Sequence, residues 1–263
     1  MLYPHIDPVI FSLGPISLRW YGLMYIIAFG LAWWLAGKRA KQPDSGWTSE
    51  QVSDVIFYGA LGVILGGRLG YVLFYKFNAF LSDPSIIYQV WQGGMSFHGG
   101  LIGVFIALIL FARRYKKSWL TVTDFVVPIV PLGLGVGRLG NFINNELWGK
   151  PTDLPWGMMQ APGGIAYHPS QLYEATLEGL VLFIIVWLYS AKPRPAGAVS
   201  GLFLVGYGTF RFLVEFVRIP DADKGYLAFD WVTMGQVLSL PMIIIGLAFI
   251  VFAYNNKKEH STS

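Results

Sequence analysis

The sequence predicts an all-α polytopic membrane protein with about seven transmembrane helices, an external N-terminus and a cytoplasmic C-terminus. Of its 263 residues, 54% are hydrophobic and 13% are charged, and the mean hydropathy is +0.52. Soluble domains carry about 25% charged residues, so this chain lacks the polar side chains that a water-facing surface requires. Its 10 Trp, 14 Tyr and 19 Phe are typical of a membrane protein with aromatic belts at both interfaces.

Seven apolar segments are long enough to cross a bilayer, which takes about 20 helical residues. In chain order the predicted spans are 16–36, 52–75, 96–112, 121–141, 171–190, 199–217 and 231–254. The N-terminus has no basic segment of the kind that begins a cleavable signal peptide, so we expect the first span to be retained. We therefore expect residues 1–263 to form one integral membrane domain.

Basic residues follow every second predicted span. The clusters are Lys38, Arg39 and Lys41, then Arg113, Arg114, Lys116 and Lys117, then Lys192 and Arg194, and last Lys257 and Lys258. Cytoplasmic loops are enriched in Lys and Arg, so this pattern predicts the orientation given above. The two longest external loops, 77–95 and 142–169, are rich in Gly, Pro and Trp and are expected to form a small external cap. Four prolines in the second loop argue against a long helix there.

Polar side chains occur inside the spans, and the predicted topology places them at one depth. At 1.5 Å per helical residue, Arg68, Arg138 and Arg211 lie roughly 24, 26 and 18 Å from the inner ends of outward-running spans. The early parts of the inward-running spans reach the same level and carry Arg19, Tyr21, Ser96, His98, His168, Ser170, Gln171 and Glu174. Because an intramembrane charge is costly, this convergence predicts a functional site in the outer half of the bilayer.

Two of these residues have a structural alternative of about equal weight. Arg68 is explained equally well by a structural ion pair with Glu174 or Glu146. Tyr21 is explained equally well as a belt aromatic at the membrane interface.

Two further patterns indicate packing or internal pairing. Arg211, Glu215 and Arg218 have i, i+4, i+7 spacing, so an internal salt bridge along one helix face is the alternative to a site. The run Leu-Gly-Gly-Arg-Leu-Gly at 65–70 resembles Gly-Val-Gly-Arg-Leu-Gly at 135–140. Both copies run outward, unlike the inverted repeats of transporters, so their small residues indicate close helix packing.

His98 is the candidate general base. It lies between glycine pairs in the run 93–100, which leaves its imidazole accessible, and its ordinary pKa of about 6.5 suits proton transfer near neutrality. The chain has no cysteine, which excludes an enzyme-derived thiol nucleophile. No group of residues has metal-ligand spacing, so we expect no metal site.

Arginines beside a histidine in the outer leaflet predict recognition of an anionic lipid headgroup, because guanidinium groups bind phosphate bidentately. Without any resemblance to a family, the residues predict only a membrane enzyme or binder that acts on such a lipid from the outer side. A transporter and a non-catalytic lipid-binding scaffold stay as alternatives. The polar residues thin out toward the cytoplasmic half, which disfavours the first, and a scaffold has no need of His98. The basic residues form no single stripe, so nucleic acid is not an expected partner.

Five motifs, in order along nearly the whole chain, resemble one family. The run 137–149, Gly-Arg-Leu-Gly-Asn-Phe-Ile-Asn-Asn-Glu-Leu-Trp-Gly, resembles the signature of bacterial prolipoprotein diacylglyceryl transferases. Supporting matches are Arg-Trp-Tyr-Gly-Leu-Met-Tyr at 19–25, Ser-Phe-His-Gly-Gly at 96–100, His-Pro-Ser-Gln-Leu-Tyr-Glu at 168–174 and Tyr-Gly-Thr-Phe-Arg at 207–211.

The resemblance implies a bacterial inner-membrane enzyme whose site faces the periplasm. Its expected substrates are phosphatidylglycerol and the lipobox-containing signal peptides of prolipoproteins, and no cofactor is expected. It would transfer an sn-1,2-diacylglyceryl group to the lipobox cysteine thiol, forming a thioether and releasing glycerol phosphate. The family's functional positions correspond here to Tyr21, His98, Arg138, Asn141, Glu146, Gly149, Tyr207, Arg211 and Glu215. Arg68, His168 and Glu174 join them as expected substrate-binding residues because of their depth.

Individual roles also follow from the resemblance. Arg138 would contact the lipid headgroup, and Arg211 would help to hold the phosphate or the leaving group. His98 is the favoured base, although nearby arginines would also lower the pKa of the incoming thiol, in which case His98 would serve positioning. Asn145 stands where glycine is common in the family, beside the signature residue Glu146.

Overall fold

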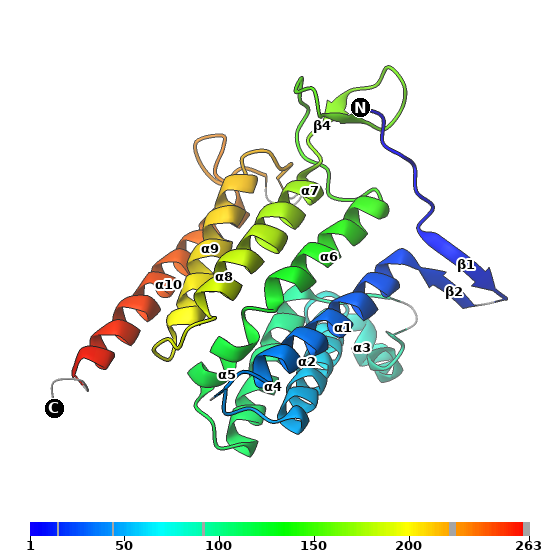
Figure 1. Cartoon of the computed structure of the whole chain (residues 1–263). Helices are drawn as coiled ribbons and strands as arrows, with labels where there is room; N and C mark the ends of the chain where they lie inside the picture. Colours follow the sequence, from blue (N-terminus) through cyan, green and yellow to red (C-terminus); the bar gives the residue numbers. More distant parts are fainter. Residues whose placement is uncertain (15, 44, 91–92, 221–224, 260–263) are drawn as a thin grey trace. The chain divides into compact units, whose positions relative to one another are not determined.

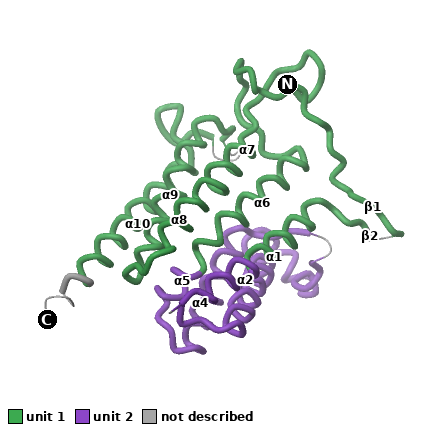
Figure 2. The backbone as a smooth tube through the Cα atoms, in the orientation of Figure 1, with its two compact units in different colours: residues 1–32, 126–263 green, residues 33–125 purple. Residues whose placement is uncertain are grey.

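The computed structural model describes residues 1–14, 16–43, 45–90, 93–220 and 225–259, and these are mostly helical (Figure 1). The chain divides into two compact units, residues 33–125 and residues 1–32 with 126–263 (Figure 2). Helix α1 (Trp20–Ala40) contributes to both units. The side chains of Lys257 and Lys258, the last predicted basic cluster, lie outside the described part.

The prediction of a polytopic all-α membrane protein is confirmed. Five helical segments of the described chain are long and apolar enough to span a membrane: Trp20–Ala40, Ser49–Tyr75, Phe97–Arg114, Ser170–Tyr189 and Met234–Asn256. The pair α5 (Trp119–Val126) and α6 (Val130–Ile143) makes a sixth if it is counted as one broken span. Helix α9 (Ala198–Val214) is apolar but has only 17 residues.

Two predicted spans differ from the observed elements. The segment 121–141 is not one continuous helix, because Pro128 has no N–H to donate and its ring clashes with the preceding turn. Helix α6 restarts just after it, with Pro131 in its first turn, where the missing N–H is tolerated. The first span begins at Trp20, since Ile16–Arg19 forms strand β2, which pairs with β1 (Val9–Leu13) in an antiparallel hairpin.

Residues 33–125 form a helical unit around α2 (Ser49–Tyr75) and α4 (Phe97–Arg114). Thr48 and Gln51 form a reciprocal capping box at the start of α2. Glycines let the two helix backbones touch: a Cβ on Gly66 would lie 2.4 Å from the Gly99 carbonyl oxygen. The predicted external loop 77–95 carries the short helices α3 (Phe77–Ser82) and η1 (Pro84–Ile87), and its residues 91–92 lie outside the described part.

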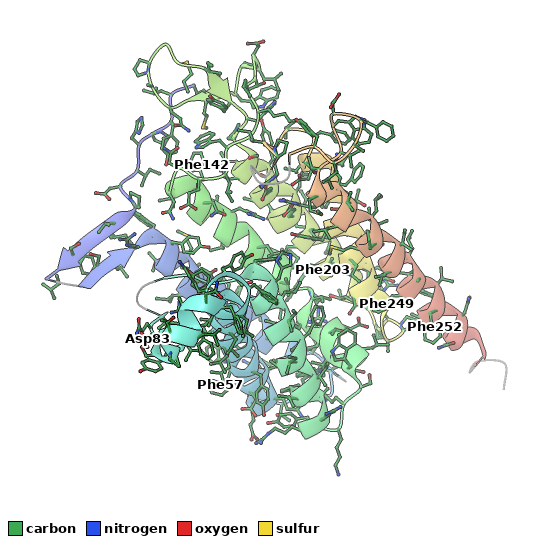
Figure 3. All side chains as sticks on the ribbon, turned by 180° about the vertical axis from the view of Figure 1, so that it is seen from behind. Phe57, Asp83, Phe142, Phe203, Phe249 and Phe252 are labelled. Atoms are coloured by element: carbon green, nitrogen blue, oxygen red, sulfur yellow. The ribbon has the colours of Figure 1, made fainter. Side chains whose placement is uncertain are left out.

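The other unit contains α6, α9, α10 (Met234–Glu259) and one long segment of three helical types. That segment runs as α7 (Ser170–Glu174), a π-helix η3 (Ala175–Val181) and α8 (Leu182–Tyr189). Leu182 and Val186 of α8 form a buried hydrophobic cluster with Val199 of α9, and Phe203 packs against this cluster. Helices α9 and α10 lie side by side, and Phe252 points outward from α10 and is well exposed, as expected of a lipid-facing side chain (Figures 1 and 3).

The second loop that was predicted to be external, 142–169, contains no long helix, as its prolines predict. Strands β3 (Met158–Met159) and β4 (Ala166–Tyr167) form a small antiparallel pair within it. The N-terminal segment crosses this loop, and the buried Tyr3 hydroxyl donates to the Phe142 and Ile143 carbonyls at 2.8 and 3.0 Å. The Tyr3 hydroxyl thereby supplies a donor to carbonyls in the last turn of α6, which anchors the end of the helix that carries Arg138.

Candidate functional site

A network of six charged side chains lies within the unit formed by residues 1–32 and 126–263. Three guanidinium groups face three carboxyl groups: Arg138, Arg211 and Arg218 against Glu174, Glu178 and Glu215. They come from α6, from α7 and η3, and from α9 and the turn after it. Segments far apart in sequence therefore converge, and three of the six residues, Arg138, Arg211 and Glu174, belong to the set predicted to lie at one depth.

Glu174 is the centre of this network. Its side chain is 1% exposed, and its Oε2 lies 2.5 Å from Arg138 Nε. Its Oε1 accepts a hydrogen bond from Arg218 Nη1 at 2.5 Å and lies 3.3 Å from Arg211 Nη1. A buried carboxylate requires such partners, because removing an ion from water is otherwise prohibitive.

Glu215 is the second anchor. Its Oε1 lies 2.6 Å from Arg211 Nη2 and 3.0 Å from Arg218 Nε, so the internal salt bridges expected from the i, i+4, i+7 spacing are confirmed. Its Oε2 accepts a hydrogen bond from Thr233 Oγ1 at 2.6 Å. A Cβ on Gly235 would lie 2.4 Å from the Glu215 carboxyl carbon, so only glycine lets α10 begin so close to this carboxylate.

Arg138 differs from the other two arginines. Its side chain is 24% exposed, against 18% for Arg211 and 10% for Arg218. It meets Glu174 through Nε, and its two terminal nitrogens donate no hydrogen bond to any residue in the described ranges. The end of this guanidinium fork can therefore donate to two oxygens of a phosphate.

Glu146 lies in a tight turn just after α6. Its carboxylate is exposed and accepts hydrogen bonds from Asn141 Nδ2 at 3.2 Å and Asn144 Nδ2 at 3.3 Å. Asn145 and Leu147, on either side, have φ angles of 60° and 59°. Asn145 suits this position, because Asn enters the left-handed region more readily than other non-glycine side chains.

The start of α7 holds this turn in place. Gln171 Nε2 donates to the Glu146 carbonyl, and Ser170 Oγ donates to the Leu147 carbonyl at 2.7 Å. Tyr21 packs against the end of α6, where a Cβ on Gly140 would lie 3.1 Å from the tyrosine ring. Its hydroxyl lies 3.4 Å from that of Tyr25.

Gly149 and His168 link the loop 142–169 to the turn that carries Arg218. The Gly149 N–H donates to the His168 carbonyl at 2.9 Å, and Gly149 forms a bridge with Arg218. A Cβ on Gly149 would lie 2.4 Å from the Val217 carbonyl oxygen, so the close approach requires glycine. His168 Nδ1 lies 3.2 Å from the Tyr173 hydroxyl, and burial, followed by the charge of Lys150, lowers the pKa of this imidazole.

Tyr207 lies one turn before Arg211 on α9. Its ring stacks on Phe203 with centroids 6.0 Å apart and packs against the core at Leu182 and Val186. It therefore supports the helix face from which Arg211 reaches the carboxylates.

Arg68 and His98 belong to residues 33–125 and are described within that unit. The Arg68 guanidinium donates to five backbone carbonyls, those of Ile86, Ile87, Gln89, Gly93 and Gly94. The side chain is buried, and these bonds tie η1 and the loop after it to α2. This arrangement favours a structural role for Arg68, although its partners are carbonyls and not the carboxylates considered from the sequence.

His98 lies in the first turn of α4, after the N-cap residue Ser96. The imidazole is exposed, and within the described residues its contact is edge-to-face with Phe97, at 5.7 Å between centroids. No hydrogen bond to the described part of the chain occupies its ring nitrogens.

Two residues of the site were not predicted: Glu178, which belongs to the network, and Thr233, which donates a hydrogen bond to Glu215. Glu178 follows Glu174 by four residues, and that spacing is a signal which the sequence contains. Thr233 carries no such signal, because its contact with Glu215 depends on how α10 packs against α9.

Fold and network together define a multi-pass membrane protein with a partly exposed arginine suited to an anionic group. The family model for prolipoprotein diacylglyceryl transferase matches residues 8–252, and the chain belongs to that family.

Curated relatives named phosphatidylglycerol–prolipoprotein diacylglyceryl transferase support this assignment. One from Coxiella burnetii is 59% identical over 260 residues, covering 98% of this chain and 100% of the relative. One from Aliivibrio salmonicida is 59% identical over 253 residues, covering 96% and 89%. One from Pseudomonas paraeruginosa is 56% identical over 255 residues, covering 97% and 96%.

Proposed function

We propose that this protein transfers the sn-1,2-diacylglyceryl group of phosphatidylglycerol to the lipobox cysteine of prolipoproteins, the first step of bacterial lipoprotein maturation. A bond forms between the cysteine sulfur and the glyceryl carbon, and the bond between that carbon and a phosphate oxygen breaks. The thiol proton passes to a base, and glycerol phosphate leaves with the electron pair. Membership of the family and the names of its relatives support this reaction.

The terminal fork of Arg138 is the observation that carries the proposal. Glu174 holds Nε at 2.5 Å and orients the guanidinium, while both terminal nitrogens stay available to the lipid phosphate. Bidentate donation neutralises the charge that grows on the phosphate as the carbon–oxygen bond breaks. Such a contact typically contributes about 10²–10³ in rate.

The other candidate residues in the unit formed by residues 1–32 and 126–263 act around this contact. Arg211 helps to keep Glu174 in place and adds positive potential behind Arg138 for the leaving phosphate, and Glu215 orients Arg211. Tyr21, Asn141 and Glu146 lie at the same end of α6 and line the path of the headgroup and the cysteine.

Four residues have supporting roles in this scheme, and one stays the candidate base. Gly149 and His168 hold the external loop to the turn of Arg218, and Tyr207 supports α9. Arg68 holds the loop after η1. His98, with an exposed imidazole, is proposed to accept the thiol proton.

We also propose that the single integral membrane domain crosses the bacterial inner membrane seven times. The broken pair α5–α6 and the 17-residue α9 would complete the seven crossings. Basic residues in the last turns of α1 and α4 support a cytoplasmic location for those ends. The N-terminus would then be periplasmic, the C-terminus cytoplasmic, and the site open to the outer leaflet.

The test uses purified protein in detergent with phosphatidylglycerol and a lipobox-containing peptide, followed by mass spectrometry of the cysteine. We expect a diacylglyceryl adduct with wild type, none with Arg138→Ala, and a strongly reduced yield with His98→Ala. An adduct lost only with Arg138→Ala would remove His98 from the role of base. A folded wild type that binds phosphatidylglycerol without forming the adduct would contradict the transferase proposal.

A further inference from the structure

Glu178 is a buried carboxylate to which the proposed reaction assigns no role. Its side chain is 1% exposed, and its nearest ion-pair distance is 3.9 Å, from Oε1 to Arg211 Nη1. The same guanidinium nitrogen lies closer to Glu174, at 3.3 Å. Glu178 Oε1 is fully buried and accepts no hydrogen bond within the described chain. Of the three carboxylates, Glu178 is therefore the one most weakly bonded to the arginines.

The backbone fixes Glu178 in this position. It lies in the π-helical turn η3, a type of turn found often at functional sites. The next residue, Gly179, meets Gly135 of α6 so closely that a Cβ on Gly179 would lie 2.7 Å from the Gly135 Cα. Because the close contact between Gly179 and Gly135 limits rotation of η3 against α6, the carboxylate stays beside Arg211 although it gains little from hydrogen bonding.

The net charge of the six-residue network depends on the carboxylate of Glu178. With all six groups ionised, three guanidinium charges and three carboxylate charges cancel. Glu174 and Glu215 each contact two or more arginines and are needed to hold them, whereas Glu178 contacts Arg211 alone. Without its charge, the network that faces the phosphate would carry one net positive charge.

We propose that Glu178 is a positioning residue for charge, which keeps the arginine network neutral so that the product can leave. This inference rests on the proposed function. Bound lipid carries one negative charge on its phosphodiester, but the released phosphomonoester carries about −1.5 to −2 at neutral pH. A network with net positive charge would hold the product more tightly than the substrate, and the enzyme would be inhibited by its own leaving group.

The test compares product inhibition in wild type and Glu178→Gln, which removes the charge and keeps the shape. With added glycerol phosphate, we expect the inhibition constant of Glu178→Gln to fall about tenfold, because one unit charge near the anion is neutralised at an intermediate dielectric. The KM for phosphatidylglycerol should fall less, and kcat should fall as release slows. A purely structural role for Glu178 would lower activity without tightening glycerol phosphate binding.

Two further variants complete the test. Glu178→Asp keeps the charge, so its inhibition constant should stay within about twofold of wild type, and it carries the comparison alone if Glu178→Gln does not fold. Glu50→Gln, the same change in the first turn of α2, should leave inhibition unchanged. The inference is overturned if Glu178→Gln binds glycerol phosphate like wild type, or if Glu178→Asp tightens binding tenfold. Wild type that forms no adduct at all would instead overturn the proposed function.

Discussion

The two Gly-Arg-Leu-Gly sequences of this chain place an arginine in opposite environments. Arg68 is 6% exposed, and its nitrogens donate to five backbone carbonyls, which are neutral and belong to η1 and the loop after it. Arg138 is 24% exposed, meets a carboxylate through Nε, and has no hydrogen bond from its terminal nitrogens to the described residues. Arg68 therefore spends its donors on backbone carbonyls of the fold, whereas Arg138 is oriented by Glu174 and keeps its terminal nitrogens for a ligand.

The flanking glycines repeat this contrast. In the first copy, Gly66 and Gly70 bring α2 into backbone contact with Gly99 of α4. In the second copy, the position equivalent to Gly66 is Val136, and Gly137 has no atom within 4 Å of a built Cβ. The packing role expected of the echo is therefore confirmed most fully in the copy whose arginine is buried. A shared motif does not imply a shared function, because the neighbouring helix decides which groups the arginine meets.

Substituting Arg138 should give the largest effect on activity. Arg138→Ala removes the available fork, so we expect adduct formation to fall by about 10³-fold, or roughly 4 kcal/mol of transition-state stabilisation. The protein should keep its melting temperature within a few degrees, because Glu174 retains Arg211 and Arg218. Rates from mass spectrometry and melting curves on the same preparation check this. A variant that transfers normally would show that Arg138 is not the phosphate ligand.

Substituting Arg68 should affect stability first. Arg68→Ala removes the donor of five partly buried backbone carbonyls, and we expect a loss of about 3 kcal/mol in the free energy of unfolding. Transfer measured per folded molecule should fall far less than in Arg138→Ala. Denaturation in detergent, with the folded fraction determined before each assay, separates the two effects. If Arg68→Ala is fully stable but does not transfer, Arg68 is a substrate ligand, as its predicted depth in the membrane suggests.

The glycines provide a matched pair of alanine substitutions. Gly66→Ala would place a Cβ 2.4 Å from the Gly99 carbonyl oxygen, and we expect it to cost about 1–3 kcal/mol because the helices must separate. Gly137→Ala meets open space and should be neutral or stabilising by up to about 1 kcal/mol. The two melting temperatures measure the difference directly. Equal destabilisation would contradict the close α2–α4 contact.

The smallest expected effect is a pH dependence of stability due to His168. Burial and the charge of Lys150 lower the pKa of this imidazole in the folded state, so the unfolded chain binds the proton more readily. The contribution of His168 is therefore complete above pH about 6.5 and is lost as the pH falls below that value. Melting temperatures between pH 7.5 and 5.5 should decline less in His168→Gln than in wild type. Parallel declines would exclude this source of pH dependence.

Much of the fold could be predicted from hydropathy because a bilayer imposes the length and composition of each span. Every predicted span contains an observed helix, and the loop 142–169 lacks a long helix as its prolines indicate. The break at Pro128 was not predicted, because the segment around it is strongly apolar and its hydropathy is that of one continuous span. The β1–β2 hairpin was missed for a similar reason: Ile16 and Leu18 are apolar in a strand as in a helix.

The candidate site was predicted as a set of residues at one depth, but its bonds were not. Topology placed Arg138, Glu174 and Arg211 together because each helix residue has a defined rise. Which carboxylate binds which arginine depends on helix rotation, and the sequence leaves that open. Arg68 has the same depth and the same motif as Arg138, so only its carbonyl partners distinguish it.

The most direct test of this contrast is to replace each of the two arginines by lysine and to measure transfer and melting temperature together. Lysine keeps the charge but cannot make the bidentate contact. The contrast predicts that Arg138→Lys transfers at least about 100-fold more slowly at an unchanged melting temperature. It predicts that Arg68→Lys melts at a lower temperature and transfers at nearly the wild-type rate per folded molecule. Normal transfer by Arg138→Lys, or slow transfer by a fully stable Arg68→Lys, would contradict it.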